Sequence, residues 1–267
     1  MWDQLTTHYC DYLTAIGRPA TTIGLRRYQI THLGHVLAVD PTRVTYDDVL
    51  AFFRLHDWKP ETRRSYRAAI RGFFAWAAKH GHLPSDPATE LPQIRVPKAS
   101  ARPCPDTTYR HALAKATPRE ALMLRLAKEA GLRRAEIAQV HAKDLRNTTA
   151  GPSLLVHGKG SNERVVPITD GLAATILDEA ADGAWCFPSQ RGAHLTPRSV
   201  GTICSALLGD EVTLHQLRHT FATAAYRGSH NLRAVQKLLG HTNLATTERY
   251  LDADDSELRA AMLAAVA

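Results

Sequence analysis

The stretch from residue 213 to residue 250 contains the side chains best suited to chemistry on a phosphodiester. His215, Arg218, His241 and Tyr250 supply imidazoles, a guanidinium and a phenol hydroxyl, and no cluster of carboxylates suited to a metal ion accompanies them. The transition state of a phosphodiester carries charge on its non-bridging oxygens, which guanidinium groups match in shape and sign, and imidazoles can give or take protons at the same centre. The set predicts phosphoryl transfer with Tyr250 as the nucleophile, without a metal or any other cofactor.

Two further cations precede this stretch at positions that suit an anion. Arg133 opens a predicted helix in the segment GLRRAEI, where free backbone N–H groups favour negative charge. Lys159 lies in the turn GKGSN between two predicted strands. Alone, each signal has an ordinary alternative: Arg133 could simply pair with Glu136 across the helix surface, and an exposed hairpin lysine is usually only solvated. For the other four residues the alternatives are a polar helix start, a glycine helix stop and a half-buried packing tyrosine.

The order and spacing of these motifs say more than any one of them. GLRRAEI, a GKG hairpin, HQLRHTFAT and LLGHTNLATTERY follow one another along the chain. This succession closely resembles the tyrosine recombinase family, also called the phage integrase family, across the whole C-terminal half. Gln216 stands where that family often has aspartate, and Arg134 where many relatives have an apolar residue, but neither replaces a catalytic side chain. The resemblance implies that the catalytic residues are Arg133, Lys159, His215, Arg218, His241 and Tyr250, with Glu136 as a supporting carboxylate.

The resemblance also implies a reaction. Free tyrosine has a pKa of about 10, so it needs a neighbouring base or cationic surroundings, and His215 is the candidate base. Attack by Tyr250 would give a 3′-phosphotyrosine and release a 5′-hydroxyl, which would take a proton from Lys159. A second 5′-hydroxyl can reverse the step without ATP. Exchange of all strands through a Holliday junction implies a homotetramer on two paired double-stranded DNA core sites.

Several readings of this activity stay open. A small phage or mobile-element integrase, without the additional N-terminal arm-binding module of larger integrases, is the favoured one, and a directionality factor is a possible partner. A Xer-type resolvase of chromosome dimers shares the same motifs. A type IB topoisomerase-like enzyme would use similar residues as a monomer, and a non-catalytic, sequence-specific DNA-binding protein would keep them only as remnants.

The N-terminal half is predicted to form four helices, at about 2–16, 21–37, 45–53 and 61–80. The apolar side of the second includes Ile23, Tyr28, Ile30, Leu33 and Leu37. In the fourth, Tyr66, Ile70, Phe73 and Ala77 share one side at 100° per residue. A stripe beside that side could follow a DNA backbone or be an ordinary solvated face, and it consists of Arg64, Arg67 and Arg71.

The C-terminal half is predicted to be helical around a small β-sheet, so the fold class is mainly α with a small sheet (α+β). Prolines between residues 91 and 105 exclude a continuous helix and indicate a linker. It separates a helical, SAM-like core-binding DNA-binding domain (1–90) from a catalytic domain (106–267). Residues 153–157 and 163–168 are the predicted hairpin strands, residues 185–188 a possible third strand, and residues 254–266 a C-terminal helix.

Composition limits the class of protein. The 267 residues carry a formal net charge of +7, which favours a polyanionic partner. No apolar run reaches the roughly 18 residues that span a bilayer, and the N-terminus does not look like a signal peptide. Cys10, Cys104, Cys186 and Cys204 are scattered, which is typical of reduced thiols. These features predict a cytoplasmic protein that binds no membrane.

Overall fold

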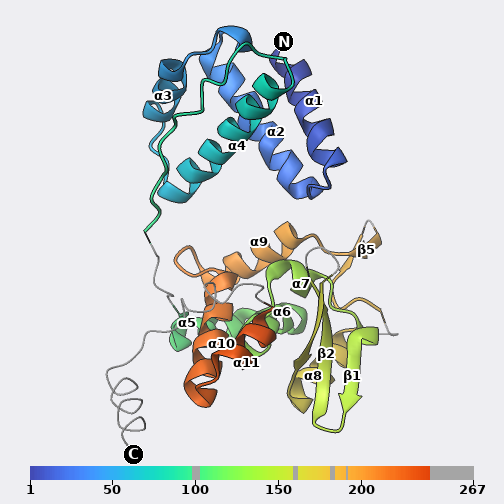
Figure 1. The fold of residues 1–267 in the computed structure, drawn as a ribbon. Helices are drawn as coiled ribbons and strands as arrows, with labels where there is room; N and C mark the ends of the chain where they lie inside the picture. The colour runs from blue at the N-terminus through green and yellow to red at the C-terminus, as the bar shows by residue number, and fades with distance from the viewer. Residues whose placement is uncertain (98–102, 159–161, 181–183, 191, 241–267) are drawn as a thin grey trace, which may run out of the picture. The chain divides into compact units, whose positions relative to one another are not determined.

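The computed structural model describes residues 1–97, 103–158, 162–180, 184–190 and 192–240. These residues are mainly helical with a small antiparallel sheet, which confirms the predicted fold class. The chain divides into two compact units, Met1–Ala99 and Ser100–Ala267 (Figure 1). The division falls inside the proline-containing stretch 91–105.

The first unit buries an aromatic core between its helices. Because α4 repeats every 3.6 residues, Ile70, Phe73 and Ala77 fall on one face, and all three are fully buried. Trp2 stacks on Phe73, with 5.8 Å between the ring centroids. The helices lie where the apolar periodicity predicts them: α1 (Trp2–Ala15), α2 (Ala20–Leu37), α3 (Tyr46–Arg54) and α4 (Pro60–Lys79), with a 3₁₀ turn at Pro41–Arg43.

The apolar side predicted for α2 is wrong at one position. The side chain of Tyr28 is 64% exposed, whereas Ile30 and Leu33 are fully buried. Residues two apart on an α-helix point about 200° from one another, so Tyr28 cannot share a face with Ile30.

The second unit packs its helices around a separate core. α6 lies at its centre and contacts α8, α9 and α10. It begins at Pro118 after a capping box formed by Thr117 and Glu120, the arrangement that leaves fewest backbone N–H groups unsatisfied. The helices of this unit are α5 (Asp106–Lys115), α6 (Pro118–Glu129), α7 (Arg134–Ala138), α8 (Asp170–Glu179), α9 (Pro197–Leu208), α10 (Leu214–Ser229) and α11 (Leu232–Leu239), with a 3₁₀ turn at Ala142–Asp144.

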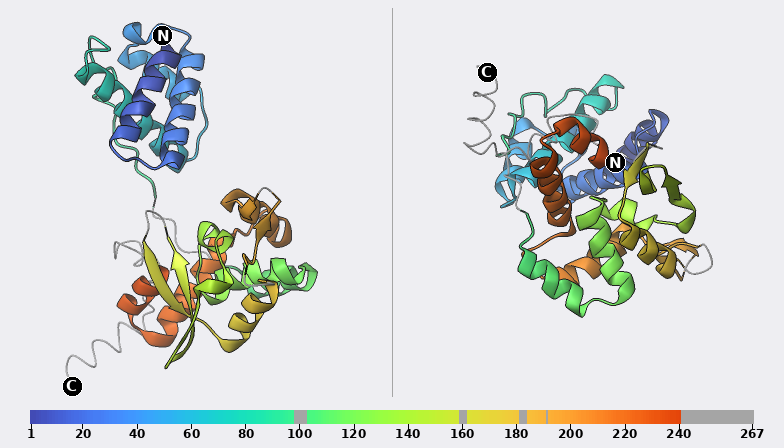
Figure 2. Two further views of the ribbon diagram at one scale, coloured as in Figure 1. Left: turned by 90° about the vertical axis from the view of Figure 1, so that its right-hand side faces the viewer. Right: turned by 90° about the horizontal axis from the view of Figure 1, so that it is seen from below.

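A three-stranded antiparallel sheet covers one side of this unit, in the order β1-β2-β3 (Figure 1, Figure 2). Its strands are β1 (Leu145–Thr148), β2 (Gly151–His157) and β3 (Glu163–Pro167), so the predicted hairpin is confirmed. The predicted third strand at 185–188 is wrong. Trp185 makes only an isolated bridge with His141, and Pro188–Ser189 (β4) pairs with Gly192–His194 (β5) instead.

The third strand of the sheet is β1, which has no apolar alternation to reveal it. Its residues are LRNT, and only Leu145 is even half-buried. Backbone pairing with β2, from Leu145 opposite Leu154 to Thr148 opposite Gly151, therefore defines this strand. The predicted C-terminal helix at 254–266 lies outside the described residues.

Candidate active site

Gly131 brings the start of α7 against α10. Its φ is 64°, in the left-handed region that glycine adopts without penalty. A Cβ at this position would lie 2.4 Å from Cδ1 of Phe221 on α10, so any side chain here would force the Phe221 ring to move. The main chain of the 131–133 turn therefore lies directly on the helix that carries Arg218.

Glu136, in the first turn of α7, is the centre of an arginine cluster. Its Oε2 accepts a hydrogen bond from the backbone N–H of Arg133 at 2.8 Å, and its Oε1 accepts one from Nη1 of Arg133 at 2.8 Å. Arg164 on β3 donates to both oxygens, at 2.8 and 2.9 Å, and Nη1 of Arg218 lies 3.6 Å from Oε2. Burial would raise the pKa of Glu136, but the bonds and charge of Arg164, the Arg133 N–H and the Arg218 charge lower that pKa to about 2.

The last turn of α11 is the second acceptor for the same arginines. The carbonyl oxygen of Leu239 accepts from Nη1 of Arg133 at 3.2 Å and from Nη2 of Arg218 at 2.7 Å. The carbonyl oxygen of Leu238 accepts from Nε of Arg164 at 2.8 Å. Carbonyls at the C-terminal end of a helix carry partial negative charge, so cations are favoured there. Three guanidiniums from α7, β3 and α10 thus meet at one carboxylate and one helix end.

Arg218 is held more tightly than an ordinary surface arginine. Its side chain is 1% exposed and also donates to the carbonyl oxygen of Gly131. A buried guanidinium with fixed acceptors loses little rotamer entropy when it binds an anion, because its fork is already oriented. The arrangement is therefore preorganised for an oxyanion.

His215 lies at the start of α10 and is exposed. The helix start is fixed by Gln216, whose Oε1 accepts from the backbone N–H of Thr213 at 2.7 Å. Gln216 thus serves as the capping-box acceptor at the start of this helix. One turn further on, His219 lies with its ring 4.3 Å from that of His215, in an edge-to-face arrangement.

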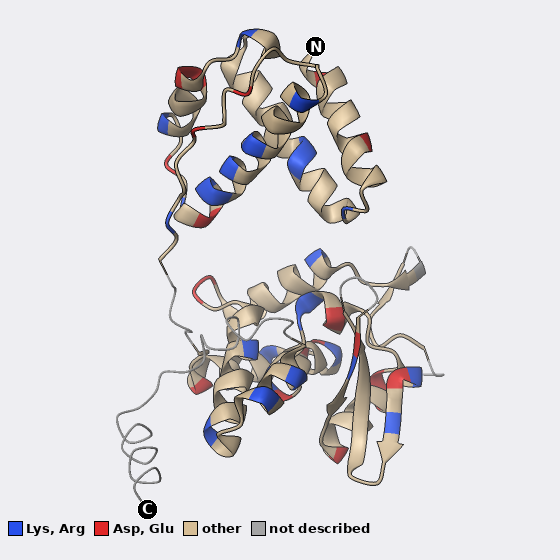
Figure 3. Cartoon of the chain, in the orientation of Figure 1, with Lys and Arg blue, Asp and Glu red and all other residues tan. Residues whose placement is uncertain are grey.

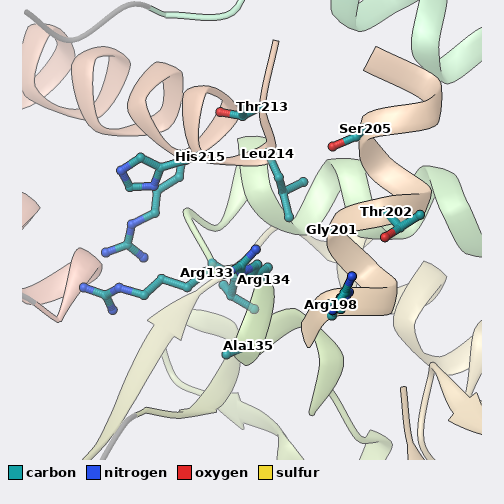
Figure 4. Close-up of a pocket in the computed structure, with 12 residues that line it drawn as sticks. Arg133, Arg134, Ala135, Arg198, Gly201, Thr202, Ser205, Thr213, Leu214 and His215 are labelled. Carbon is teal, nitrogen blue, oxygen red and sulfur yellow. The ribbon is translucent and has the colours of Figure 1, made fainter. Parts of the chain in front are cut away.

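A cavity of about 760 Å³ opens where these elements meet. Arg133, His215 and Arg218 all line it, and Figure 4 shows the His215 ring and the Arg133 guanidinium on the same side of the cavity. α9 forms the opposite wall with Arg198, Thr202 and Ser205. Arg134 also lines the cavity, beside Gly201 of α9, where a Cβ would lie 3.6 Å from its Nη1. The cavity walls therefore present cations and hydroxyl groups, which suit a phosphate-bearing ligand.

Three of the predicted catalytic residues, Lys159, His241 and Tyr250, lie outside the described residues. The residues that flank the first two are described. The Gly158 N–H donates to the Asn162 carbonyl at 2.7 Å, which joins the described residues on either side of 159–161. Gly240, with a φ of 62°, ends α11 directly before His241.

Arg164 is a residue of the cluster that sequence reasoning missed. The strand pattern contains a signal for it, because residues two apart point to the same face of a strand. Val166 is fully buried, so Arg164 also points inward. A basic residue on the buried face of a strand indicates a buried anion, here Glu136 at a sequence separation of 28.

The three arginines predicted on α4 differ in their surroundings. Arg64 and Arg71 are exposed, and basic positions follow one another along α4 in Figure 3. Arg67 is half-buried, and both its Nε, at 3.1 Å, and its Nη2 donate to the carbonyl oxygen of Leu91. Arg67 thus fixes the chain that leaves the first unit.

Among the described residues, no group of three or more His, Cys, Asp or Glu side chains could hold a metal ion. No described helix is both long enough and apolar enough to cross a bilayer.

Comparison with known proteins places these observations in a family. The sequence model of the phage integrase family matches residues 107–257. Tyrosine recombinase XerD of Caulobacter vibrioides is 34% identical over 222 residues, covering 72% of this chain and 70% of the relative. Tyrosine recombinase XerC of Oceanobacillus iheyensis is 30% identical over 250 residues, covering 82% of this chain and 80% of the relative.

Solved structures share the fold. A lambda integrase dimer bound to a COC′ core site has a TM-score of 0.75 at 17% identity, covering 94% of this chain and 95% of that one. XerH site-specific recombinase bound to difH substrate has a TM-score of 0.67 at 20% identity, covering 90% and 78%. With the family match over the motif-bearing half and relatives along most of the chain, the protein belongs to the phage integrase family of tyrosine recombinases, site-specific recombinases that cut and rejoin DNA strands.

Proposed function

We propose that this protein binds a double-stranded DNA core site and recombines it through a covalent bond to Tyr250. The observation that carries the proposal is the convergence of Arg133, Arg218 and His215 on one cavity, with both arginines oriented by Glu136 and by the end of α11. The lambda integrase and XerH relatives of this fold are described as bound to DNA sites, which supports the same partner here.

In this proposal the two arginines bind the non-bridging oxygens of the scissile phosphate. Their positive charge stabilises the negative charge that develops in the transition state. This electrostatic stabilisation is the largest catalytic contribution in such sites. His241 adds a donor to the same phosphate. Loss of either arginine is expected to slow cleavage on the order of 10²-fold.

Proton transfers complete the step. His215 takes the proton of the Tyr250 hydroxyl as its oxygen forms the bond to phosphorus. The bond from phosphorus to the 5′ oxygen breaks, and Lys159 gives that oxygen a proton. The products are a 3′-phosphotyrosine and a free 5′-hydroxyl. A 5′-hydroxyl from the partner duplex then attacks the phosphorus and gives its proton to Lys159, while the bond from phosphorus to Tyr250 breaks and His215 returns a proton to the tyrosine oxygen.

The first unit serves, in the same proposal, as the core-binding domain. Arg64 and Arg71 are its candidate phosphate contacts, because both are exposed on α4. A homotetramer on two paired sites would exchange the strands through a Holliday junction, and a directionality factor would bias the outcome. The reaction would take place in the cytoplasm, on bacterial or phage DNA.

Integration and excision of a phage or mobile element is the role we propose. A Xer-type resolvase of chromosome dimers is the second candidate, and the XerC and XerD relatives at 30% and 34% identity favour it specifically. Mapping the DNA bound in the source cell by sequencing covalent complexes separates the two: sites flanking a mobile element support integration, and a single chromosomal site away from any mobile element supports resolution.

The nucleophile is tested with Tyr250→Phe, which loses only the phenol oxygen. A duplex selected from a random library by binding to the wild-type protein serves as the site, nicked so that the cleaved strand diffuses away. Wild type is expected to form an SDS-resistant complex on this DNA, whereas Tyr250→Phe should bind equally well and form none. A covalent complex with the Phe variant would show that another residue is the nucleophile. No complex with wild type would favour a DNA-binding protein without activity, and relaxation of plasmid lacking the site would favour a topoisomerase-like enzyme.

A further inference from the structure

We infer that Arg164 is a positioning residue for strand cleavage: it holds the Glu136 carboxylate, so that Arg133 and Arg218 keep their charge and their donors for the scissile phosphate. The inference rests on the proposed roles of those two arginines. It concerns a residue on β3, in the strand that follows the hairpin turn.

Arg164 grips Glu136 more completely than either neighbour does. Its Nη1 and Nη2 donate to the two carboxylate oxygens at 2.8 and 2.9 Å, the paired geometry in which guanidinium and carboxylate match best. Arg133 reaches one oxygen through its side chain, and Arg218 approaches the other only to 3.6 Å. Arg164 is therefore the main counter-ion of this carboxylate.

The Arg164 side chain points towards α11 and not into the cavity, unlike the side chains of Arg133 and Arg218. Its side chain is 12% exposed, and its Nε donates to the Leu238 carbonyl at 2.8 Å. It does not line the cavity, whereas Arg133 and Arg218 do. Its role is consequently exerted through Glu136 and α11 and not by contact with DNA.

Charge balance gives the reason for this role. The Glu136 side chain is 3% exposed, and a carboxylate buried to this extent needs compensating cations. With Arg164 in place, the Arg164–Glu136 pair is neutral, and Arg133 and Arg218 together present two positive charges to a phosphate. Without Arg164, the Glu136 carboxylate would be neutralised by Arg133 and Arg218 instead. Each hydrogen bond that these arginines make to Glu136 competes with one to the phosphate.

The position of Arg164 also explains why its loss should affect chemistry more than binding. Leu238 and Leu239 form the last turn of α11, and Gly240 follows, where a Cβ would lie 3.0 Å from Cδ of Arg164. The side chain thus fixes the acceptors of Arg133 and Arg218 relative to β3. Contacts of the first unit with DNA do not depend on it.

The test compares Arg164→Gln and Arg164→Lys with a matched control, Arg146→Gln, which changes an exposed arginine on β1 of the same sheet. Single-turnover cleavage of the nicked selected duplex is measured at saturating protein, and the Kd for the same duplex is measured by fluorescence anisotropy. Arg164→Gln should slow cleavage on the order of 10²-fold while Kd changes by no more than about twofold. The cleavage rate of Arg164→Lys should lie between those of wild type and Arg164→Gln, because an ammonium restores the charge but not the bidentate hydrogen bonding of a guanidinium. Arg146→Gln should cleave at the wild-type rate.

Two further measurements separate this role from general structural damage. In a Glu136→Gln background no buried carboxylate remains to be neutralised, so adding Arg164→Gln should slow cleavage by no more than about a further twofold. On a duplex with sulfur at the 5′ bridging position, the leaving group needs no proton. The slow cleavage of Arg164→Gln should persist on this substrate, because Arg164 does not act through the general acid.

Three results would each overturn the inference. Arg164→Gln could cleave within about twofold of the wild-type rate, it could slow cleavage as much in the Glu136→Gln background as in wild type, or its cleavage rate could recover on the sulfur substrate. Thermal unfolding is recorded for every variant. If Arg164→Gln does not fold, Arg164→Lys decides, and a wild-type rate for it would contradict a role for the fork. Absence of any covalent complex with wild-type protein would instead refute the proposed function, so the two failures are distinguishable.

Discussion

At the scale of single residues, Arg133 has a structural and a functional role at once, because it pairs with Glu136 and also lines the cavity. The simple helix-surface pair expected from their spacing does form, at 2.8 Å. It does not remove Arg133 from the cavity, which the same side chain lines. A local ion pair is therefore no argument against a catalytic role when the carboxylate is itself shared with guanidiniums from two other elements.

The role of Lys159 as general acid gives a prediction at this scale. Lys159→Ala should cleave normal DNA slowly but recover on the substrate with sulfur at the 5′ bridging position. A thiol has a pKa near 8.5, far below that of an alcohol, so a thiolate leaves without a proton. Equal impairment on both substrates, measured as single-turnover rates, would indicate that Lys159 binds the phosphate instead.

At this scale, the sequence could predict residues that stand in short local motifs but not contacts between residues far apart in the chain. The catalytic candidates stand in short motifs, so their types and order are visible in the sequence. Arg164 and Glu136 are 28 residues apart, and their contact exists only once β3 has packed beside α11 and the two side chains meet. Tertiary ion pairs of this kind leave only a weak local trace, here a charged residue on an inward strand position.

At the scale of elements, the turn end of the β2–β3 hairpin is clamped by His157. Its Nδ1 lies 3.0 Å from Glu163 Oε1 and its Nε2 lies 3.0 Å from Asp144 Oδ1. Chiefly the hydrogen bond with Asp144, and then the charges of both carboxylates, raise the pKa of His157 although burial opposes this. The imidazole thus joins β2, β3 and the 3₁₀ turn at Ala142–Asp144.

This clamp predicts a pH dependence of stability. Because the folded-state pKa lies above its ordinary value of 6.5, the stabilisation is fully present below that value and is lost as pH rises through the folded pKa. The Tm of the second unit should fall over that window, and His157→Gln should remove this part of the fall. His111→Gln, on an exposed position of α5, is the control and should keep it. An identical pH profile for His157→Gln and wild type would contradict the clamp.

The arginines of α4 give a prediction that now differs between positions. Arg64→Ala with Arg71→Ala should weaken DNA binding and reduce the slope of log K against log salt by about 1.8, since each phosphate contact contributes about 0.9. Arg67→Ala should mainly lower the Tm of the first unit, because it loses the bonds to the Leu91 carbonyl. Anisotropy titrations at several salt concentrations test this, and an unchanged slope for the double variant would make the stripe a solvated face.

Elements were predictable where a periodic apolar face exists and unpredictable where backbone pairing alone defines them. α4 shows the first case, with its buried side given by the 3.6-residue repeat. β1 shows the second, because its polar residues have no alternation and the strand forms only against β2. Residues 185–188 were apolar enough for a strand, but Cys186 and Phe187 are buried as core residues of the second unit without a ladder.

At the scale of the whole molecule, the prediction concerns assembly. Residues 255–267 have a short apolar stripe that must pack against something, either this chain or a neighbouring protomer. We expect the second: deleting 255–267 should spare binding to a half-site but abolish cooperative occupancy of the full site and synapsis. Gel-shift titrations on half and full sites measure this. Loss of stability together with half-site binding would indicate packing within the same chain.

Gly131 has a consequence for how far this sequence can diverge without losing its site. Phe221 occupies the space of any side chain at residue 131, and the carbonyl of the same residue accepts from Arg218. Contact of the Gly131 main chain with the Phe221 ring therefore sets how closely the turn before α7 approaches α10. Core residues elsewhere can be exchanged and repacked over long evolutionary times while Arg133 and Arg218 keep their spacing. The same contact makes residue 131 one of the least replaceable positions in the chain, although it contributes no functional group at all.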